Sequence, residues 1–352
     1  MQRIIIFCLC FSKLVYGNLP TTTVWEIRPL VGNDSNGGCF DSTQAGTDYT
    51  QQNAAQFSFT DLVLVTSTTV TSVSHSFIST DVGNCVNIIS GTGFTSGFYE
   101  IISVSSGTAT LDRSAGTPSS IAGVWAEGGA LASPVTATIG AENGVGGITY
   151  FPAGQKFWLM SSGTFTQTST LYIQGQGDPQ ISSSLAYIGY TTARGDGGFF
   201  SWTTATNSTP LITLGFYNGS NIQFSNISFS NTASVRSYMV TQNGCCASNV
   251  QFFNDIFDGF STAIDNSSQG GMPFTSIISS EIKNSISDGI QSNQSLNVIG
   301  CYIHNNGGNG IYLSNNTIFA IDFQGFCYKI CYFLYSFINR LFCNFTRYIL
   351  VL

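Results

Sequence analysis

Residues 220–316 alternate short apolar segments with polar turns, and each segment places two aliphatic residues eight positions apart. The first members of successive pairs are 29, 26 and 21 residues apart. An irregular repeat of this length with almost no helical periodicity is typical of short β-strands stacked on one another. We therefore predict a stack of β-strands over this region. The pairs, whose members we expect to face the core, are Ile227/Val235, Ile256/Ile264, Ile282/Ile290 and Ile303/Ile311.

The polar corners between the strands favour asparagine. In residues 221–231 (NIQFSNISFSN), apolar side chains at alternate positions face a narrow core and a short polar corner turns the chain. Asparagine tolerates left-handed backbone geometry and can hydrogen-bond to the neighbouring turn. Stacked strands would place equivalent corners about 4.8 Å apart. We predict an asparagine ladder at Asn284 and Asn305, with Asp258 in the equivalent place one turn earlier.

The N-terminal half shows a different strand pattern. Residues 23–29 (TVWEIRP) predict a first strand, and residues 18–56 are expected to form an N-terminal cap. Period-two alternation in residues 62–74, 83–91 and 97–113, with Gly-rich turns between them, favours about five short antiparallel strands. We predict a small barrel-like β module over residues 57–134, inserted before a parallel strand stack over residues 135–317.

The two ends of the chain depart from these patterns. Residues 1–17 contain Arg3, an apolar run and a V-Y-G triplet, which fits either a secretory signal or an incidental apolar leader. Residues 318–352 are rich in Phe, Tyr and Cys, and charged residues interrupt them about every ten positions. A membrane helix needs about 20 predominantly apolar residues. We therefore expect an atypical tail outside the repeat and no membrane partner.

Composition excludes one class of partner. Only 8% of the residues are charged, and 11 Lys and Arg against 18 Asp and Glu give a net charge of −7. Nucleic-acid backbones require clustered cations, and the sequence has no basic patch. Gly, Ser, Thr and Asn take the place of the usual charged residues, so we expect a neutral surface rich in hydroxyl and amide groups and no nucleic-acid partner.

The cysteines and histidines do not suggest a framework or a metal site. Five cysteines lie in the body of the chain, and no C-x-x-C pair occurs. The two histidines, His75 and His304, lack metal-ligand spacing. The prediction is that the body cysteines are small buried thiols and that the protein needs neither a metal nor a cofactor.

Several segments resemble a known superfamily. These are TVWEIRP (23–29), VGNCVNIISGTGF (82–94), YIGYTTARGDGG (187–198) and NGGNGIYLSNN (306–316). With the repeat, they resemble the pectin-lyase-like proteins and are similar to β-helix proteins that recur in phage genomes and environmental sequences. The resemblance covers residues 21–316 and implies an all-β fold, a right-handed parallel β-helix (solenoid).

The resemblance specifies function less well, because this superfamily includes phage tailspikes and fibres, polysaccharide lyases and hydrolases, and adhesins. The first expectation is a structural, receptor-binding protein of the tail-fibre or tailspike type, extracellular or virion-associated, that contacts a surface polysaccharide. The alternatives are a secreted polysaccharide lyase or glycoside hydrolase, and a bacterial surface adhesin. Tailspikes are typically trimers, so the resemblance allows a homotrimer.

An enzyme of this superfamily would need acidic residues placed for catalysis. The N-T-D, D-D, G-H-G and R-I-K motifs of the galacturonan hydrolases and the W-I-D-H signature of the pectate lyases are all missing. A generic glycosidase needs two carboxylates about 5 to 9.5 Å apart. If Ile256 faces the core, Asp255 and Glu281 point outward on neighbouring turns, with Asp258 further along. If Phe257 faces the core instead, Asp255 turns inward.

Binding residues are predicted from chemistry suited to sugars. Sugar rings stack on Tyr or Trp, while polar side chains hydrogen-bond the hydroxyls. Arg194 and Asp196, flanked by glycine, are a further pair that fits either a binding site or a turn with a local ion pair. The aromatic candidates are Tyr302, His304 and Tyr312 on the last regular turn, and Trp202 and Tyr217 in earlier segments.

Overall fold

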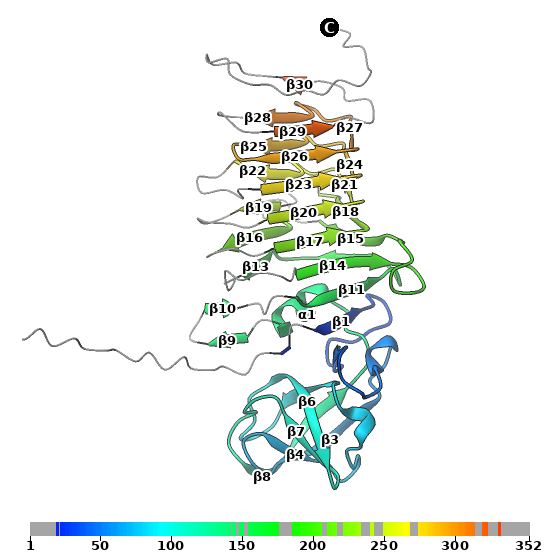
Figure 1. Ribbon diagram of the computed structural model, residues 1–352, viewed down its shortest axis with the longest axis vertical. Coiled ribbons are helices and arrows are strands. Elements are labelled where there is room, and N and C mark those ends of the chain that lie inside the picture. The colour runs from blue at the N-terminus through cyan, green and yellow to red at the C-terminus, as the bar shows by residue number, and fades with distance from the viewer. Residues whose placement is uncertain are drawn as a thin grey trace, which may run out of the picture.

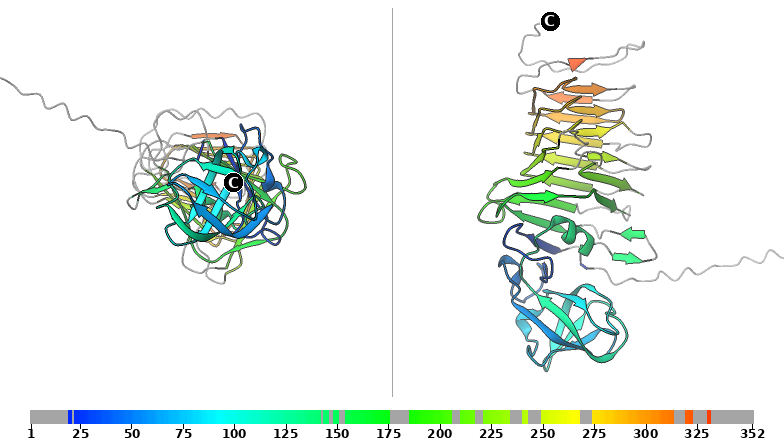
Figure 2. Two further views of the ribbon diagram at one scale, coloured as in Figure 1. Left: turned by 90° about the horizontal axis from the view of Figure 1, so that it is seen from below. Right: turned by 180° about the vertical axis from the view of Figure 1, so that it is seen from behind.

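The computed structural model describes most of the chain between residues 19 and 331. The described residues are 19–20, 22–141, 143–145, 148–150, 154–175, 185–205, 210–216, 221–233, 240–242, 249–267, 274–313, 319–322 and 330–331. Two bodies are visible, a small barrel and a tall stack of strands, with the barrel at one end of the stack (Figure 1, Figure 2). Within the described part of the chain, no helix is long and apolar enough to cross a membrane.

The barrel is closed and antiparallel, which confirms the expected β module. Its strands pair in the closed order β3-β4-β7-β6-β5-β8. Alternate side chains fill its interior, among them Leu62, Ile88, Ile101 and Trp125, each fully buried. The strands are β3 (Phe57–Leu64), β4 (Thr69–Thr71), β5 (Cys85–Ser90), β6 (Gly97–Ser105), β7 (Thr108–Leu111) and β8 (Ser119–Glu127).

Short elements join the barrel to the stack. The 3-10 helices η1 (Tyr49–Gln51) and η2 (Ser79–Asp81) lie before and within the barrel sequence, and α1 (Pro134–Ala141) follows it. The Ser133 hydroxyl accepts hydrogen bonds from the first N–H groups of α1, which caps the helix. The hairpin of β9 (Asn143–Val145) and β10 (Ile148–Tyr150) then leads into the stack.

The stack consists of three parallel sheets. Successive strands from β11 to β28 join the first, second and third sheet in rotation, so three consecutive strands make one level (Figure 1). At the base, β1 is parallel to β11 and antiparallel to β2. Two short strands after residue 318, β29 and β30, add to the first and third sheets. The all-β class and the parallel sheets are therefore confirmed.

The strands of each sheet follow in order of pairing. The first sheet contains β2 (Cys39–Asp41), β1 (Thr23–Ile27), β11 (Lys156–Met160), β14 (Leu185–Tyr190), β17 (Asn221–Ser225), β20 (Asn249–Phe253), β23 (Phe274–Ile278), β26 (Leu296–Ile299) and β29 (Phe319–Asp322). The second contains β12 (Phe165–Gln167), β15 (Phe200–Thr204), β18 (Ile227–Asn231), β21 (Ile256–Asp258), β24 (Glu281–Lys283) and β27 (Tyr302–His304). The third contains β13 (Leu171–Gly175), β16 (Ile212–Phe216), β19 (Val240–Gln242), β22 (Ile264–Asn266), β25 (Ile290–Ser292), β28 (Ile311–Leu313) and β30 (Ile330–Cys331).

Columns of stacked side chains form the core between the sheets. In the first sheet Phe157, Tyr187, Phe224 and Phe252 are register partners on successive levels. Their neighbouring ring centroids lie 4.5, 5.1 and 5.3 Å apart, nearly parallel. In-register pairing therefore aligns equivalent side chains, and each ring is buried by the rings above and below it.

Left-handed residues at one corner also align. Between the first and second sheets, Asn226, Asn254, Ser279 and Gly300 have φ values of 57°, 55°, 51° and 60°. The Asn254 amide donates to the Asn226 side-chain oxygen at 2.7 Å, so these two asparagines form a ladder.

The predicted ladder at the next corner needs one correction. Asn284 and Asn305 are left-handed, with φ of 57° and 55°, but the residue equivalent to them one level earlier is Gly259, with φ of 79°. Asp258 pairs with Lys283 instead.

The expectation that the body cysteines are free thiols is wrong for one pair. Cys39 of β2 and Cys85 of β5 form a disulfide with a Cα–Cα distance of 5.2 Å. Both residues are fully buried. The bond therefore ties the edge strand of the first sheet to the barrel. Cys301 is a buried free thiol.

Candidate functional site

The outer face of the second sheet gathers several of the predicted site residues. Because strands alternate their side chains, buried Phe229, Phe257, Ile282 and Ile303 point inward and their neighbours point outward. Two outward columns follow from the register. One contains Ser228, Ile256, Glu281 and Tyr302, and the other contains Ser230, Asp258, Lys283 and His304. Toward the last levels the face thus changes from hydroxyls to charged and aromatic groups.

The register corrects the first assignment of Asp255. Phe257 pairs with Ile282, whereas Ile256 pairs with Glu281 and is partly exposed. The inward direction of Phe257 brings Asp255 inward too, and its exposed fraction is 1%. Its carboxylate accepts the Ile227 N–H at 2.8 Å. Asp255 and Glu281 therefore do not form an outward carboxylate pair.

Glu281 is the centre of the outward cluster. The Lys283 amine donates to its carboxylate at 2.8 Å, and His304 Nε2 lies 2.9 Å from its other oxygen. Despite partial burial, which opposes the change, these contacts lower the pKa of Glu281 below its usual value. Tyr302, 45% exposed, stacks on His304 with ring centroids 4.0 Å apart. The cluster thus presents an exposed aromatic ring beside an ionised carboxylate and an amine.

Asp258 lies on the same face. Its carboxylate accepts a hydrogen bond from the Asn284 amide at 2.8 Å. Asp258 is one strand and two residues away from Glu281, a Cβ separation of about 8 Å from the strand spacing and rise.

An inverting glycosidase holds two carboxyl groups about 6.5 to 9.5 Å apart, and it also needs a carboxylic acid that keeps its proton near neutral pH. The lowered pKa of Glu281 does not fit that role. Burial raises the pKa of Asp255, which lies in the core. Glu281 is therefore better suited to accepting hydrogen bonds than to donating a proton.

Arg194 and Asp196 do not pair with each other. The Arg194 guanidinium bonds Glu26 at 2.8 Å and Asp48 at 2.9 Å, which ties the loop after β14 to the N-terminal segment. The exposed Asp196 carboxylate accepts several backbone N–H groups of its own loop, from Thr191 to Gly198, and these bonds lower its pKa. Both residues hold loop geometry, so the expected local ion pair is wrong.

The other aromatic candidates are dispersed. Tyr312 lies on β28 of the third sheet, away from Tyr302 on the second. Trp202 is fully buried in the core, where its indole N–H donates to Gln167 at 2.8 Å, so it cannot stack on a ligand. Tyr217 lies outside the described residues.

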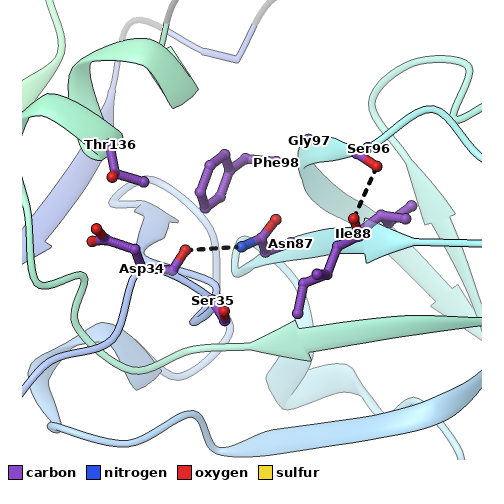
Figure 3. A pocket seen from close by; sticks show the side chains of 9 residues that line it. Asp34, Ser35, Asn87, Ile88, Ser96, Gly97, Phe98 and Thr136 are labelled. Atoms are coloured by element: carbon purple, nitrogen blue, oxygen red, sulfur yellow. Dashed lines mark hydrogen bonds between the residues drawn. The ribbon is translucent and has the colours of Figure 1, made fainter.

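A shallow, open pocket at the junction of barrel and stack was not predicted from sequence. Its volume is about 330 Å³, and Phe98 lies between Thr136 of α1 and Asn87 of β5 (Figure 3). The Asn87 amide donates to the backbone oxygens of Asp34 and Asn36. The Asp34 carboxylate accepts the N–H groups of residues 132 and 133. These polar groups join the two bodies, and no sequence motif marks them because they come from distant segments.

Comparisons with known proteins identify no relative of this chain. Searches against protein-family models, curated proteins and solved structures find no match to this chain.

Proposed function

We propose that this chain is a structural, receptor-binding protein of the phage tail-fibre or tailspike type, and that its stack is a right-handed parallel β-helix of the pectin-lyase-like kind. The rotation of successive strands among three parallel sheets supports this fold. Such a stack is long and continuous, and its outer faces repeat at a fixed spacing, which suits an extended ligand.

The proposed ligand is a surface polysaccharide, and the outward cluster of Glu281, Lys283, Tyr302 and His304 carries this proposal. An exposed tyrosine ring offers a surface on which a sugar ring stacks. The carboxylate oxygens can accept hydrogen bonds from sugar hydroxyls, and the ammonium group can donate hydrogen bonds to them. Asp258 and Ser230 extend one polar column of this face down the second sheet, whereas in the other column Ile256 separates Ser228 from Glu281.

Two further observations support a location outside the reducing cytosol. The buried disulfide between Cys39 and Cys85 is of a kind that persists in oxidising compartments. The low charge content and the surface rich in hydroxyl and amide groups suit a glycan-contacting exterior. An extracellular or virion-associated protein, with a homotrimer as its tailspike-like assembly, is therefore the proposal.

Binding of the full chain to a panel of capsular and other surface polysaccharides tests this function. Loss of one stacking ring costs about 1 kcal/mol, so Tyr302→Ala should weaken binding about fivefold. Tyr172→Ala is the matched control, because Tyr172 is 55% exposed on the third sheet. Absence of binding to any polysaccharide, or equal losses in both variants, would overturn the proposal.

The same panel separates binding from hydrolysis. We expect no new reducing ends or unsaturated uronate after prolonged incubation. Turnover that Glu281→Gln or Asp258→Asn abolishes would assign the chain to the polysaccharide lyases or hydrolases instead.

A further inference from the structure

One end of the barrel interior contains a buried cluster of ligating side chains. His75, Asp81 and Glu127 each offer one ligand atom, and these atoms all lie within 4.8 Å of one another. Their exposed fractions are 8%, 0% and 0%. His75 Nε2 lies 2.8 Å from one Asp81 oxygen, which also accepts the Ile78 N–H. Two carboxyl groups and one imidazole thus converge in a space closed to solvent.

Three carboxyl oxygens of this cluster lack a partner. Among the described residues, neither Glu127 oxygen has a hydrogen bond, and neither has Oδ1 of Asp81. Unpaired buried polar groups are costly, and a buried carboxylate without a cation is costlier still. By contrast, the buried Asp255 carboxylate of the stack accepts a backbone N–H through one oxygen, and only its other oxygen lacks a partner. The barrel cluster therefore offers three carboxyl oxygens to a cation.

Strand geometry fixes the direction of these groups. Glu127 is two residues after Trp125 on β8, so both point into the barrel. The His75 ring stacks on Phe57 with ring centroids 3.6 Å apart and lies edge-on to Phe77. Aromatic packing thus holds the imidazole beside the two carboxyl groups.

We propose that the barrel binds one divalent transition-metal ion, Zn²⁺ or Mn²⁺, through His75 Nε2 and the carboxylates of Asp81 and Glu127. Imidazole nitrogen suits zinc and carboxylate oxygen suits manganese, and a mixed set accepts either ion. Two carboxylates balance the charge of a divalent cation, so the closed interior gains a neutral site. This proposal departs from the expectation that His75 has no metal-binding role: Asp81 is six residues from it, but Glu127 comes from a distant strand.

The ion would fix the end of β8, where the chain leaves the barrel. His75 lies in the segment between β4 and η2, Asp81 ends η2, and Glu127 ends β8 between β3 and β5. Immediately after Glu127, Gly128 and Gly129 adopt φ of 66° and 73° and turn the chain back toward the stack. A shared ion therefore links three segments at the point where the barrel joins the stack, and its role is structural.

Metal binding by the untagged full chain tests this proposal. Chelator-treated protein is titrated with Zn²⁺, Mn²⁺, Ca²⁺ and Mg²⁺ by calorimetry, and its melting temperature is followed. We expect one Zn²⁺ or Mn²⁺ per chain, a higher melting temperature, and at least about 100-fold weaker binding for Glu127→Gln and for His75→Gln. Glu100→Gln is the matched control, because Glu100 is a buried barrel carboxyl outside the cluster. It should bind as the parent does.

A second measurement uses the parent chain alone, so it tests the proposal even if a variant fails to fold. The parent chain loaded with Co²⁺ should show visible absorption bands of a nitrogen- and oxygen-ligated ion, and Zn²⁺ should abolish them. Absence of any stoichiometric ion in the parent, or binding unchanged in Glu127→Gln, would overturn the proposal.

Discussion

The barrel and the stack are both built from β-strands, yet they place their polar side chains differently. The stack core consists largely of aligned apolar columns, with the buried Asp255 carboxyl beside them, and its Glu281 cluster lies on the outer face. The barrel interior contains the carboxyl group of Glu127, whose two oxygens have no partner among the described residues. A stack gains stability level by level from repeated apolar contacts. A buried carboxyl group without a partner destabilises the barrel, and a bound cation would offset that cost.

The largest expected effect is on the apolar columns. Phe224→Ala should destabilise the stack by about 3–5 kcal/mol, because it leaves a cavity between the rings of Tyr187 and Phe252. Phe253→Ala is the control, because Phe253 is 45% exposed on the neighbouring level. Chemical denaturation followed by circular dichroism measures the difference. Similar losses in the two variants would mean that the columns do not hold the stack together.

A smaller effect should arise from the barrel carboxyl of Glu100. Burial, with Asp41 and Asp112 nearby, raises the pKa of Glu100 to about 8. Between its usual pKa and this value the unfolded chain ionises while the folded chain keeps the proton, so stability falls as pH rises from about 5 to 8. Glu100→Gln should flatten this fall, which is at most about 1.4 kcal/mol for each pH unit in this range. Denaturation at a series of pH values measures it, and parallel curves for parent and variant would contradict it.

The stack carboxyl of Glu281 should respond with the opposite sign and the smallest magnitude. The pKa of Glu281 is lowered, so its stabilising contacts are present above its usual pKa and are lost as pH falls through the lowered one. Glu281→Gln should cost about 0.5 kcal/mol at pH 7 and nothing at low pH, because the group is partly exposed. A greater loss in acid than at pH 7 would refute this assignment.

The sequence patterns predict where the strands lie better than they predict which residues of neighbouring strands pair. The eight-residue spacing marks the repeat, but Ile256 and Phe257 are both apolar, and only pairing with the next level decides which faces the core. A slip of one residue reverses every side chain, so choosing Ile256 as the inward residue puts Asp255 on the wrong face. Glu281 was expected as a catalytic residue and Tyr302 and His304 as binding residues, and only the register of β24 and β27 places the three side by side.

Contacts between distant segments could not be predicted. Cys39 and Cys85 are 46 residues apart and belong to different bodies. His75 and Glu127 meet only because the barrel closes, which no local spacing encodes. The N-terminal segment of residues 1–17 and most of residues 318–352 lie outside the described chain, so the expectations for these ends stay predictions.

The contrast between a polar barrel interior and a polar stack surface is tested most directly by anomalous X-ray diffraction at the zinc edge, from crystals of the full chain grown with Zn²⁺. We expect a peak inside the barrel, in contact with His75, Asp81 and Glu127. A barrel interior without a peak, or a peak beside Glu281 and His304 alone, would contradict it.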